Sequence, residues 1–435
     1  MRIGIVGTGI AGLTAAWYLN RAGHHVTVFE KHSSFGMEAH CVEFQVGDSN
    51  TSGRLLYSDV PPRMFNSAQW PRLWELYDEL GVEIQAVNPT KSFAKPGQAA
   101  VLKLSANYQP KLSAELILNP VSRTILKDIG RMMSAAPKYL SDYGSSVGEQ
   151  DGFQDQQTFG EYLKSNRYSS EFIYQFLFPA LSSTVCTCSY ESLNRYPAAT
   201  LLEAMLKLIE PEGLFRTKHG TRDVVSRLSS RFDEVHLSTS ITNVRQTDSG
   251  CSIETDLGDS FSFDHVVVAT QANAAIGLVE SISEIEQEAL GSFKYEQVET
   301  IVHTDVALMP TRRKDWSTFN LLSNPDHSAA MCTILLNQFY PEWDCDETVF
   351  QTIMPFDDPR AETVIARSRM QRPVVDSGSA TGHELLGRIH SHRGDQADRR
   401  IWYCGSYASP GIPLLESGVS SAIGIAERLL APAPI

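Results

Sequence analysis

Three glycines and a glutamate near the start of the chain have the spacing of a dinucleotide-binding turn. The segment Gly7-Thr8-Gly9-Ile10-Ala11-Gly12 follows an apolar run, and Glu30 ends the next one. In such a turn the first glycine permits a tight bend, the second admits a pyrophosphate to a helix N-terminus, and the third lets helix and strand pack closely. Glu30 would accept hydrogen bonds from a ribose. The pattern predicts a nucleotide cofactor and leaves NAD and FAD open.

The elements that must position this turn are predicted on both sides of it. Residues 2–6 form a short apolar run typical of a buried parallel strand, and residues 25–29 form a second one. Between them Leu13, Ala16 and Leu19 are spaced to cover one face of a helix that Gly23 ends. Strand, turn, helix, strand and acid in this order predict a Rossmann-type α/β fold.

Two later segments favour FAD over NAD. Gly36 and Met37 lie shortly after Glu30 and are followed by His40, and this segment resembles the second glycine-containing turn of glutathione-reductase-like FAD proteins. Near the other end, residues 401–406 predict a buried strand, and a helix rich in small residues runs to Leu430. A second strand-to-helix turn brought back to the cofactor would supply helix N-terminal N–H groups to a flavin ring or to the pyrophosphate.

His303 and Asp305 are candidate catalytic residues. They alternate with apolar and small residues on a predicted strand over 300–307, so both side chains would share one face. They could bind a substrate carboxylate or act as acid and base. Alternatively, they hydrogen-bond to an adjacent loop and fix a junction between domains.

Composition excludes several classes of function. The chain has 435 residues, with 51 acidic and 37 basic side chains and a net charge of −14, so nucleic acid would be repelled. No apolar run is long enough to span a bilayer, and the first strand begins too early to leave room for a signal peptide, so we expect a cytoplasmic protein. The seven cysteines include no C-x-x-C pair. We therefore expect reduced thiols and no metal site.

The sequence resembles the flavin-containing amine oxidoreductase family of FAD enzymes. The resemblance is carried by the N-terminal turn, by residues 236–244 and 263–270, and by the C-terminal strand and helix. A closer similarity is to a subgroup of predicted NAD/FAD-binding, amine-oxidase-like proteins, through His303-Thr304-Asp305-Val306-Ala307-Leu308-Met309-Pro310, through residues 215–222, and through Gly405-Ser406-Tyr407. The stretch 303–310 is the most specific of the three.

The resemblance implies FAD as cofactor and a set of residues around it. Ile241 would contact the adenine side through its backbone, the strand that ends at Ala269 and Thr270 would pass near the cofactor, and Ser406 stands where many FAD enzymes have an aspartate. Including the residues above, the expected cofactor contacts are Gly7, Gly9, Ile10, Ala11, Gly12, Glu30, Lys31, Gly36, Met37, His40, Ile241, Ala269, Thr270, Gly405, Ser406, Pro413, Leu414 and Leu415.

The resemblance also bears on catalysis. True amine oxidases commonly have a lysine near the flavin and an aromatic pair that flanks the amine. In this sequence the lysine position falls near Glu299, and one aromatic position falls on Leu414. Arg63 lies where family members pass a loop beside the flavin ring, so it could meet a flavin anion, a substrate carboxylate or only a surface acid. We therefore treat His303, Asp305, Glu299 and Arg63 as candidate catalytic residues.

The expected fold class is α/β, with a glutathione-reductase-like FAD domain and a mixed α+β substrate domain. The family organisation implies a discontinuous FAD domain over 1–68, 214–275 and 385–435, with 69–213 and 276–384 forming the substrate domain. The pattern further predicts a helix over 69–80, helices over 159–180 ending near Pro179, and a surface loop over 144–157.

The sequence therefore predicts an FAD-dependent oxidoreductase that takes hydride from a C–H bond of a small organic substrate. Amine oxidation and C–C desaturation both stay open, and the substrate could be lipid-like or a secondary metabolite. Dioxygen or another acceptor would reoxidise the flavin. A redox-neutral double-bond isomerase and a non-catalytic flavin-binding protein are the alternatives.

Overall fold

A parallel sheet of five strands is built around the N-terminal strand in the order β19-β13-β1-β2-β9. Its strands are β1 (Arg2–Val6), β2 (His25–Phe29), β9 (Glu234–His236), β13 (His265–Val268) and β19 (Ile401–Tyr403). After its first residue each of β1 and β2 is buried throughout, as a sheet covered on both faces requires. The first two strands confirm the prediction. The strand predicted over 401–406 is shorter, because the chain leaves the sheet at Cys404 and enters a 3₁₀ turn, Ser406–Ala408.

The structure is a computed structural model that describes residues 1–46, 54–105, 108–143, 157–208, 213–343, 345–391 and 399–431. The loop predicted over 144–157 lies outside these residues except for its last one. Within the described ranges, no helix combines the length and the apolar character needed to cross a membrane.

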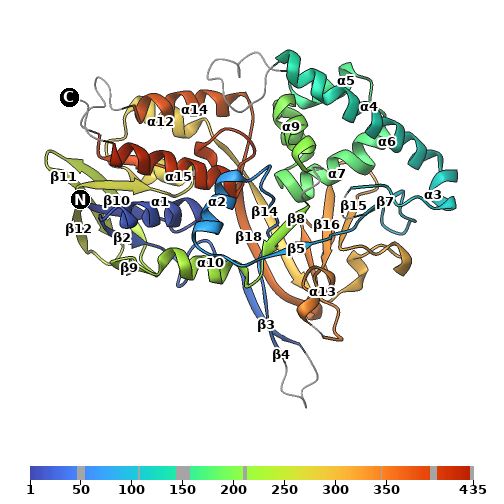
Figure 1. Cartoon of the computed structure of the whole chain (residues 1–435), viewed down its shortest axis with the longest axis horizontal. Helices are drawn as coiled ribbons and strands as arrows, with labels where there is room; N and C mark the ends of the chain where they lie inside the picture. Colours follow the sequence, from blue (N-terminus) through green and yellow to red (C-terminus); the bar gives the residue numbers. More distant parts are fainter. Residues whose placement is uncertain are drawn as a thin grey trace.

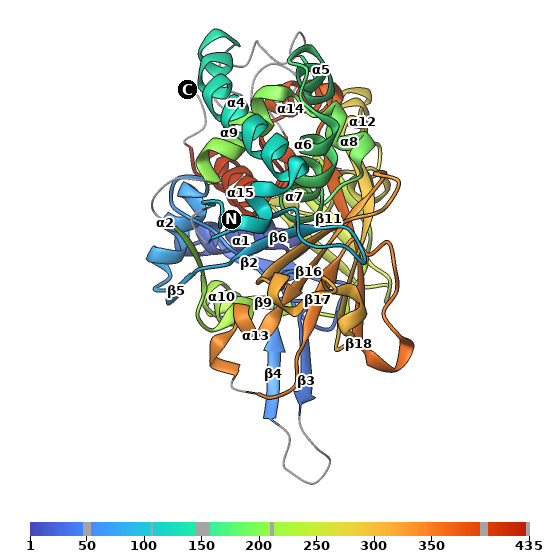
Figure 2. The ribbon, with the colours of Figure 1, turned by 90° about the vertical axis from the view of Figure 1, so that its right-hand side faces the viewer.

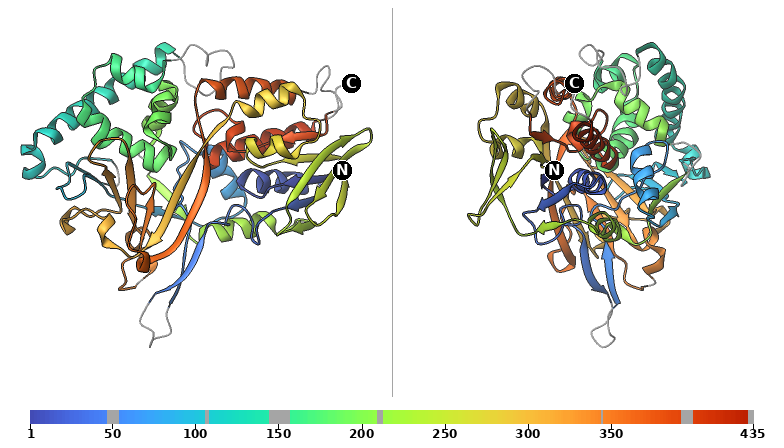
Figure 3. Two further views of the ribbon diagram at one scale, coloured as in Figure 1. Left: turned by 180° about the vertical axis from the view of Figure 1, so that it is seen from behind. Right: turned by 60° about the vertical axis from the view of Figure 1, so that its left-hand side comes forward.

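Helices cover both faces of the parallel sheet (Figure 1). On one face, α1 (Ile10–Arg21) and α15 (Leu415–Leu430) share a core with strands β1 and β2. On the other, α11 (Ala272–Leu278), α12 (Glu284–Gly291) and α14 (Ser377–Ile389) pack with a three-stranded antiparallel sheet. That sheet consists of β10 (Ile241–Thr247), β11 (Gly250–Thr255) and β12 (Ser260–Phe263). Figure 3 shows the same layers from behind.

A second, seven-stranded sheet has the order β18-β14-β17-β16-β15-β6-β7. Its strands are β6 (Lys91–Ala94), β7 (Leu102–Leu104), β14 (Lys294–His303), β15 (Phe319–Ser323), β16 (Ala330–Leu335), β17 (Phe350–Ile353) and β18 (Val364–Val374). The strands β14 and β18 are the long antiparallel pair that connects this sheet with the region of the parallel one (Figure 1). The pairing β15–β6 is parallel, so the sheet is mixed.

A helical layer covers the seven-stranded sheet (Figure 2). It consists of α3 (Ala114–Leu118), α4 (Pro120–Tyr143), α5 (Phe159–Ser165), α6 (Ser170–Phe172), α7 (Phe178–Ala180), α8 (Tyr190–Arg195) and α9 (Ala198–Leu208). The largest apolar core joins this layer to the sheet through buried aromatic residues such as Phe159, Phe178 and Tyr196. The smaller elements are α2 (Pro71–Glu79), α10 (Gly220–Ser229), α13 (Leu336–Phe339) and two strand pairs, β3 (Val42–Val46) with β4 (Arg54–Ser58) and β5 (Ile84–Val87) with β8 (Leu214–Thr217).

The helical segment predicted to end near Pro179 continues past it. Two π-helical turns, Ile173–Leu177 and Leu181–Cys186, flank α7. Pro179 lies in α7 directly between the two π-helical turns, and it has no N–H to donate to the preceding turn. The wider π turns therefore carry the chain to Thr187, whose φ of +48° is left-handed.

The two-domain division of the chain stays a prediction. The parallel sheet takes β1 and β2, then β9 and β13, and finally β19 from the three segments predicted to form the FAD domain. Helices α12 and α14, most of which lie between residues 276 and 384, pack in the same core as that sheet.

Candidate cofactor and substrate site

The glycine turn between β1 and α1 forms a cradle with room for a ligand. Gly7 has a φ of +96°, and a side chain on Gly12 would lie 1.9 Å from the Gly7 carbonyl oxygen, so neither position accepts a larger residue. At Gly9 the space where a Cβ would stand is open. Gly9 also provides no side-chain cap for α1, so the first N–H groups of this helix are available to an anion.

Thr8 joins this turn to Glu30 and to the second turn at Gly36. Its hydroxyl donates to Glu30 Oε2 at 2.7 Å and accepts from the Gly36 N–H at 2.7 Å. The Met37 N–H donates to the Thr8 carbonyl at 3.0 Å. A Cβ atom on Gly36 would lie 2.7 Å from Glu30 Oε2, so only glycine fits at this position without moving Glu30. The two predicted turns are therefore one hydrogen-bonded unit.

Glu30 is buried at the end of β2. Burial alone would raise the pKa of its carboxyl group, but hydrogen bonds from Thr8 and His32 outweigh this effect and hold the pKa below its ordinary value. The group is therefore an ionised acceptor at neutral pH. The next residue, Lys31, is exposed.

The C-terminal turn brings a second helix N-terminus close to the first. A side chain on Gly418 of α15 would lie 2.7 Å from a methyl group of Ile10 in α1, so the first turns of the two helices pack closely. Leu414 precedes α15 without capping it. Ser421 on α15 accepts the Gly405 N–H at 3.1 Å and donates to the Gly405 carbonyl at 2.9 Å. Two uncapped helix N-termini therefore lie near one edge of the sheet.

Of the remaining expected cofactor residues, two lie directly against the glycine turn. Ala269 lies against Gly12, and Thr270 lies against Gly7. Ile241 begins β10 and packs partly buried on the core behind β13. His40 lies beside His32, and burial, together with the charges of His32, Arg63 and Lys31, lowers its pKa. Direct contact of the whole expected set with the cofactor stays a prediction.

Arg63 points back to the second turn. Its guanidinium donates to the Met37 carbonyl at 2.8 Å and to the Thr221 hydroxyl. Burial would lower its pKa, but the nearby carboxylate of Asp59 reverses the shift, and the pKa is raised. Asp59 itself accepts the Thr221 N–H at 3.0 Å. Arg63 therefore lies beside the turn that is expected to contact the cofactor. The carboxylate of Asp59 partly balances its positive charge.

A second arginine, which the sequence analysis missed, approaches the C-terminal turn. Arg372 on β18 donates from Nη2 to the Pro413 carbonyl at 3.3 Å and from Nε to the Thr187 hydroxyl at 2.9 Å. Burial lowers its pKa, and the positive charge of Arg63 acts in the same direction, although an arginine stays protonated. In the sequence, the signal that could have drawn attention to Arg372 is a basic residue directly before Pro373 and Val374 in a strand.

His303 and Asp305 lie at the far end of β14, where protein groups satisfy them. The Nδ1 atom of His303 accepts the Asp305 N–H at 3.1 Å, and Nε2 donates to the Thr352 hydroxyl at 2.8 Å. Burial lowers the pKa of His303 to about 4, so the ring is neutral at pH 7. The strand ends at His303, so Asp305 is not on its face as predicted but begins a 3₁₀ turn and pairs with Arg360.

Glu299 lies on the same strand and pairs with two arginines. Its carboxylate accepts from Arg367 at 2.9 Å and from Arg369 at 2.9 Å. Its neighbours Val298 and Thr300 point to the opposite side, where Val298 belongs to the core beneath the helical layer. The structure therefore does not place Glu299 with Arg63 and Arg372. Catalytic roles for Glu299, His303 and Asp305 stay predictions.

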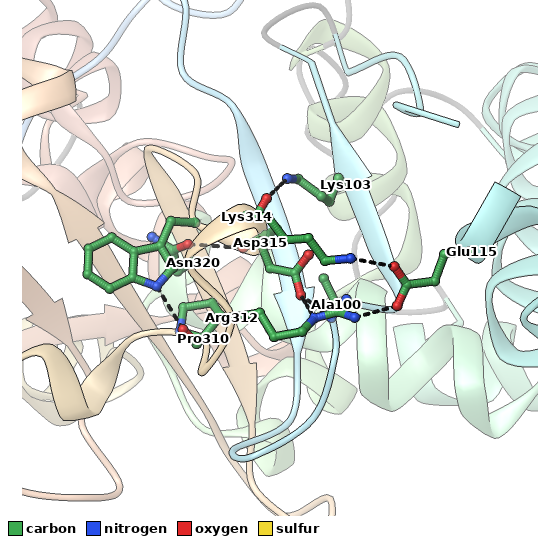
Figure 4. A network of polar contacts seen from close by, with 10 residues as sticks. Ala100, Lys103, Glu115, Pro310, Arg312, Lys314, Asp315 and Asn320 are labelled. Atoms are coloured by element: carbon green, nitrogen blue, oxygen red, sulfur yellow. Dashed lines mark hydrogen bonds and ion pairs between the residues drawn. The ribbon is translucent and has the colours of Figure 1, made fainter. Parts of the chain in front are cut away.

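The part of the chain that follows Asp305 is held in place by a polar network (Figure 4). The buried carboxylate of Asp315 accepts from Arg312 at 2.7 Å and from the Ala100 N–H at 3.1 Å. Lys314 and Arg312 both contact Glu115 of α3. These contacts connect the segment to the strand pair β6–β7 and to α3. The network is a structural junction, and within the described ranges no group of three metal-ligating side chains occurs.

Solved structures share this architecture along their whole length. A CLA-producing fatty acid isomerase from P. acnes matches with a TM-score of 0.66 and 15% identity, over 99% of this chain and 99% of the other. A putrescine oxidase solved with putrescine gives a TM-score of 0.66 and 15% identity over 99% and 100%. Cyclohexylamine oxidase from Brevibacterium oxydans gives 0.66 and 14% over 99% and 99%. At these identities the likeness establishes the fold.

A family comparison establishes more than the fold. The model of the flavin-containing amine oxidoreductases matches residues 10–317, most of the chain. Its match begins inside the glycine turn, whose open space at Gly9 and uncapped N–H groups suit a pyrophosphate. The protein belongs to the flavin-containing amine oxidoreductase family and is an FAD-dependent oxidoreductase.

Proposed function

We propose that the protein removes hydride from a C–H bond of a small organic substrate that carries no ammonium group at its reacting end. When bound, FAD supplies the acceptor for the two electrons. The observation that supports the choice of substrate is the pair of guanidinium groups, Arg63 and Arg372, which donate to the backbone of the two turns expected to contact FAD.

The cofactor half of the proposal uses backbone groups and one carboxylate. The N–H groups at the start of α1 would hold the pyrophosphate, with Gly9 leaving the approach open. Glu30, ionised and fixed by Thr8, would accept hydrogen bonds from the ribose. The N-terminus of α15, after Pro413 and Leu414, would direct its N–H groups at the other end of the cofactor.

The substrate half rests on charge. An ammonium group near two guanidinium groups would be repelled, and the effect is strong where water is excluded. The position expected for the lysine of amine oxidases is Glu299, which is bound to Arg367 and Arg369 instead. Desaturation of a C–C unit, or oxidation beside an uncharged nitrogen, therefore fits better than oxidation of a simple primary amine.

Anaerobic reduction of the bound flavin tests this function. The FAD-loaded protein is mixed with candidate substrates without oxygen, and the visible absorption of FAD is followed. Loss of absorption with matched formation of an unsaturated or oxidised product supports the proposal, and dioxygen or an artificial acceptor should then restore the colour. Product formation without net bleaching would indicate the isomerase alternative instead. Bleaching by primary amines alone would contradict the charge argument.

A further inference from the structure

Arg372 carries a charge that the described protein groups do not neutralise. Its side chain is half-buried on β18, and its hydrogen-bond acceptors are the Thr187 hydroxyl and the Pro413 carbonyl, both uncharged. Among the residues that the structure describes, it forms no ion pair with a carboxylate. Removing a cation from water is unfavourable unless a counter-charge or several hydrogen bonds replace the water. A half-buried guanidinium with only uncharged acceptors is suited to pair with an anionic ligand group.

The carboxylate best placed to pair with Arg372 is that of Glu296, and it forms hydrogen bonds with other groups. Glu296 lies directly opposite Arg372 in the β14–β18 register. Its carboxylate accepts the Ser189 N–H at 2.6 Å and the Ser189 hydroxyl at 2.8 Å, and it also binds the Ser192 hydroxyl. Glu296 therefore holds the N-terminus of α8 rather than the guanidinium across the strand pair.

The second arginine adds to the positive charge of this region. Arg63 lies near enough to Arg372 to lower the pKa of the latter. The charge of Arg63 is offset by Asp59, which shares Thr221 with it. Arg372 is therefore the guanidinium with a charge left to offer, and the carbonyl it contacts belongs to Pro413, beside the expected flavin position.

The local backbone holds the guanidinium in one orientation. Thr187 follows the π-helical turn Leu181–Cys186 and has a left-handed backbone with φ +48°, which is unfavourable for a β-branched residue. In this conformation its hydroxyl accepts from Arg372 Nε at 2.9 Å. π turns and strained residues concentrate at ligand sites, where the surrounding packing maintains them. The strain is therefore located at the residue that fixes the unneutralised cation.

We propose that Arg372 binds a carboxylate of the substrate, and that the protein acts on a small organic acid. A guanidinium presents two parallel N–H donors to a carboxylate, which gives both affinity and orientation. The partly buried apolar side chains of Met370, two positions earlier on β18, and Leu414, beside Pro413, would contact the carbon skeleton. The inference deepens the proposed function and rests on it.

Matched ligand pairs test the charge preference. The full-length, FAD-loaded protein is titrated under anaerobic conditions with octanoate, octanamide and octylamine, and with phenylacetate and phenylacetamide. Binding is measured from the change in the visible spectrum of FAD. We expect each carboxylate to bind at least tenfold more tightly than its amide, and octylamine to bind most weakly. Equal binding of carboxylate and amide in both pairs, or preference for the amine, would overturn the proposal.

Two variants assign the preference to the residue. Arg372→Gln should weaken carboxylate binding about tenfold or more and leave amide binding within twofold, whereas Arg372→Lys should restore part of it. Arg369→Gln is the matched control, because Arg369 lies on the same strand but is exposed and bound to Glu299. It should keep the preference for carboxylates. Where a variant does not fold, the wild-type ligand pairs still decide.

A second readout separates substrate binding from an effect on the cofactor. If Arg372 served only the flavin, Arg372→Gln would shift the midpoint potential of FAD without changing carboxylate affinity, and this result would overturn the proposal. Failure of the wild-type protein to bind FAD would contradict the proposed function itself. Retained FAD with no carboxylate preference would contradict only the present inference.

Discussion

Replacing Gly9 by alanine should separate the folding of the glycine turn from its binding of FAD. Gly9 has a φ of −64° and a ψ of 178°, which alanine adopts, and the position of the added methyl group is open. The free energy of unfolding of the apoprotein should therefore lie within about 0.5 kcal/mol of the wild-type value, as it does for most substitutions away from contacts. The same methyl group would occupy the approach of the pyrophosphate to α1.

The expected loss of FAD affinity follows from the hydrogen bonds at the helix N-terminus. A hydrogen bond to a charged group contributes about 1.5–3 kcal/mol. Losing one such bond raises Kd at least about tenfold, since 1.4 kcal/mol corresponds to a factor of ten. At an FAD concentration of about 100 times the wild-type Kd, the ligand adds about 2.7 kcal/mol to stability. A tenfold weaker site would retain roughly half of this stabilisation.

Chemical unfolding of each variant with and without FAD provides the assay. Gly387→Ala is the control, because Gly387 lies in α14 with open space at its Cβ position. Gly387→Ala should raise the free energy of unfolding slightly both with and without FAD, and it should leave the Kd for FAD unchanged. Gly12→Ala should destabilise even the apoprotein, because its Cβ would lie 1.9 Å from the Gly7 carbonyl oxygen. Unchanged FAD stabilisation in Gly9→Ala would refute the assignment of the pyrophosphate to this turn.

Three further predictions concern residues around the site and the fold. Thr8→Val should weaken FAD binding about tenfold, because Glu30 and the Gly36 N–H lose a shared partner; Thr8→Ser should restore binding in the same titration. His303 has a pKa of about 4 when folded against an ordinary 6.5, so the unfolded chain binds more protons between these values. Stability should rise with pH from about 4 to 6.5 by on the order of 3 kcal/mol, and urea unfolding of His303→Gln should lack this part. Asp315→Ala should cost about 1–3 kcal/mol by leaving the Ala100 N–H unpaired, whereas Glu115→Ala at the exposed end of the network should change the urea midpoint little.

The cofactor turns could be predicted from the sequence because their signals are local. The glycine spacing, the apolar runs of β1 and β2 and the acid at their end all lie within the first 30 residues. Gly7 and Gly12 each meet a steric requirement of the fold, the first through its positive φ and the second through its close approach to the Gly7 carbonyl oxygen. The helix ending at Leu430 was equally evident from its small residues and length.

The substrate side could not be predicted in the same way. Arg372 approaches Pro413 and Thr187 only because β18 pairs antiparallel with β14 and because two π turns carry the chain past Pro179. These are long-range pairings and register shifts, for which the sequence offers no periodic signal. Asp305 shows the same limit at short range: an alternating pattern continued beyond the residue at which the strand ends.

The visible absorption spectrum of the purified protein, taken before and after denaturation, is the most direct measurement. The cradle formed by Gly9, Thr8 and Glu30 predicts a flavin spectrum that moves to the supernatant as FAD when the protein is denatured. Flavin retained on the precipitate would point instead to covalent attachment, with His40 or a cysteine as the candidate. A protein that carries no flavin and takes up none when FAD is added would contradict the cofactor site described above.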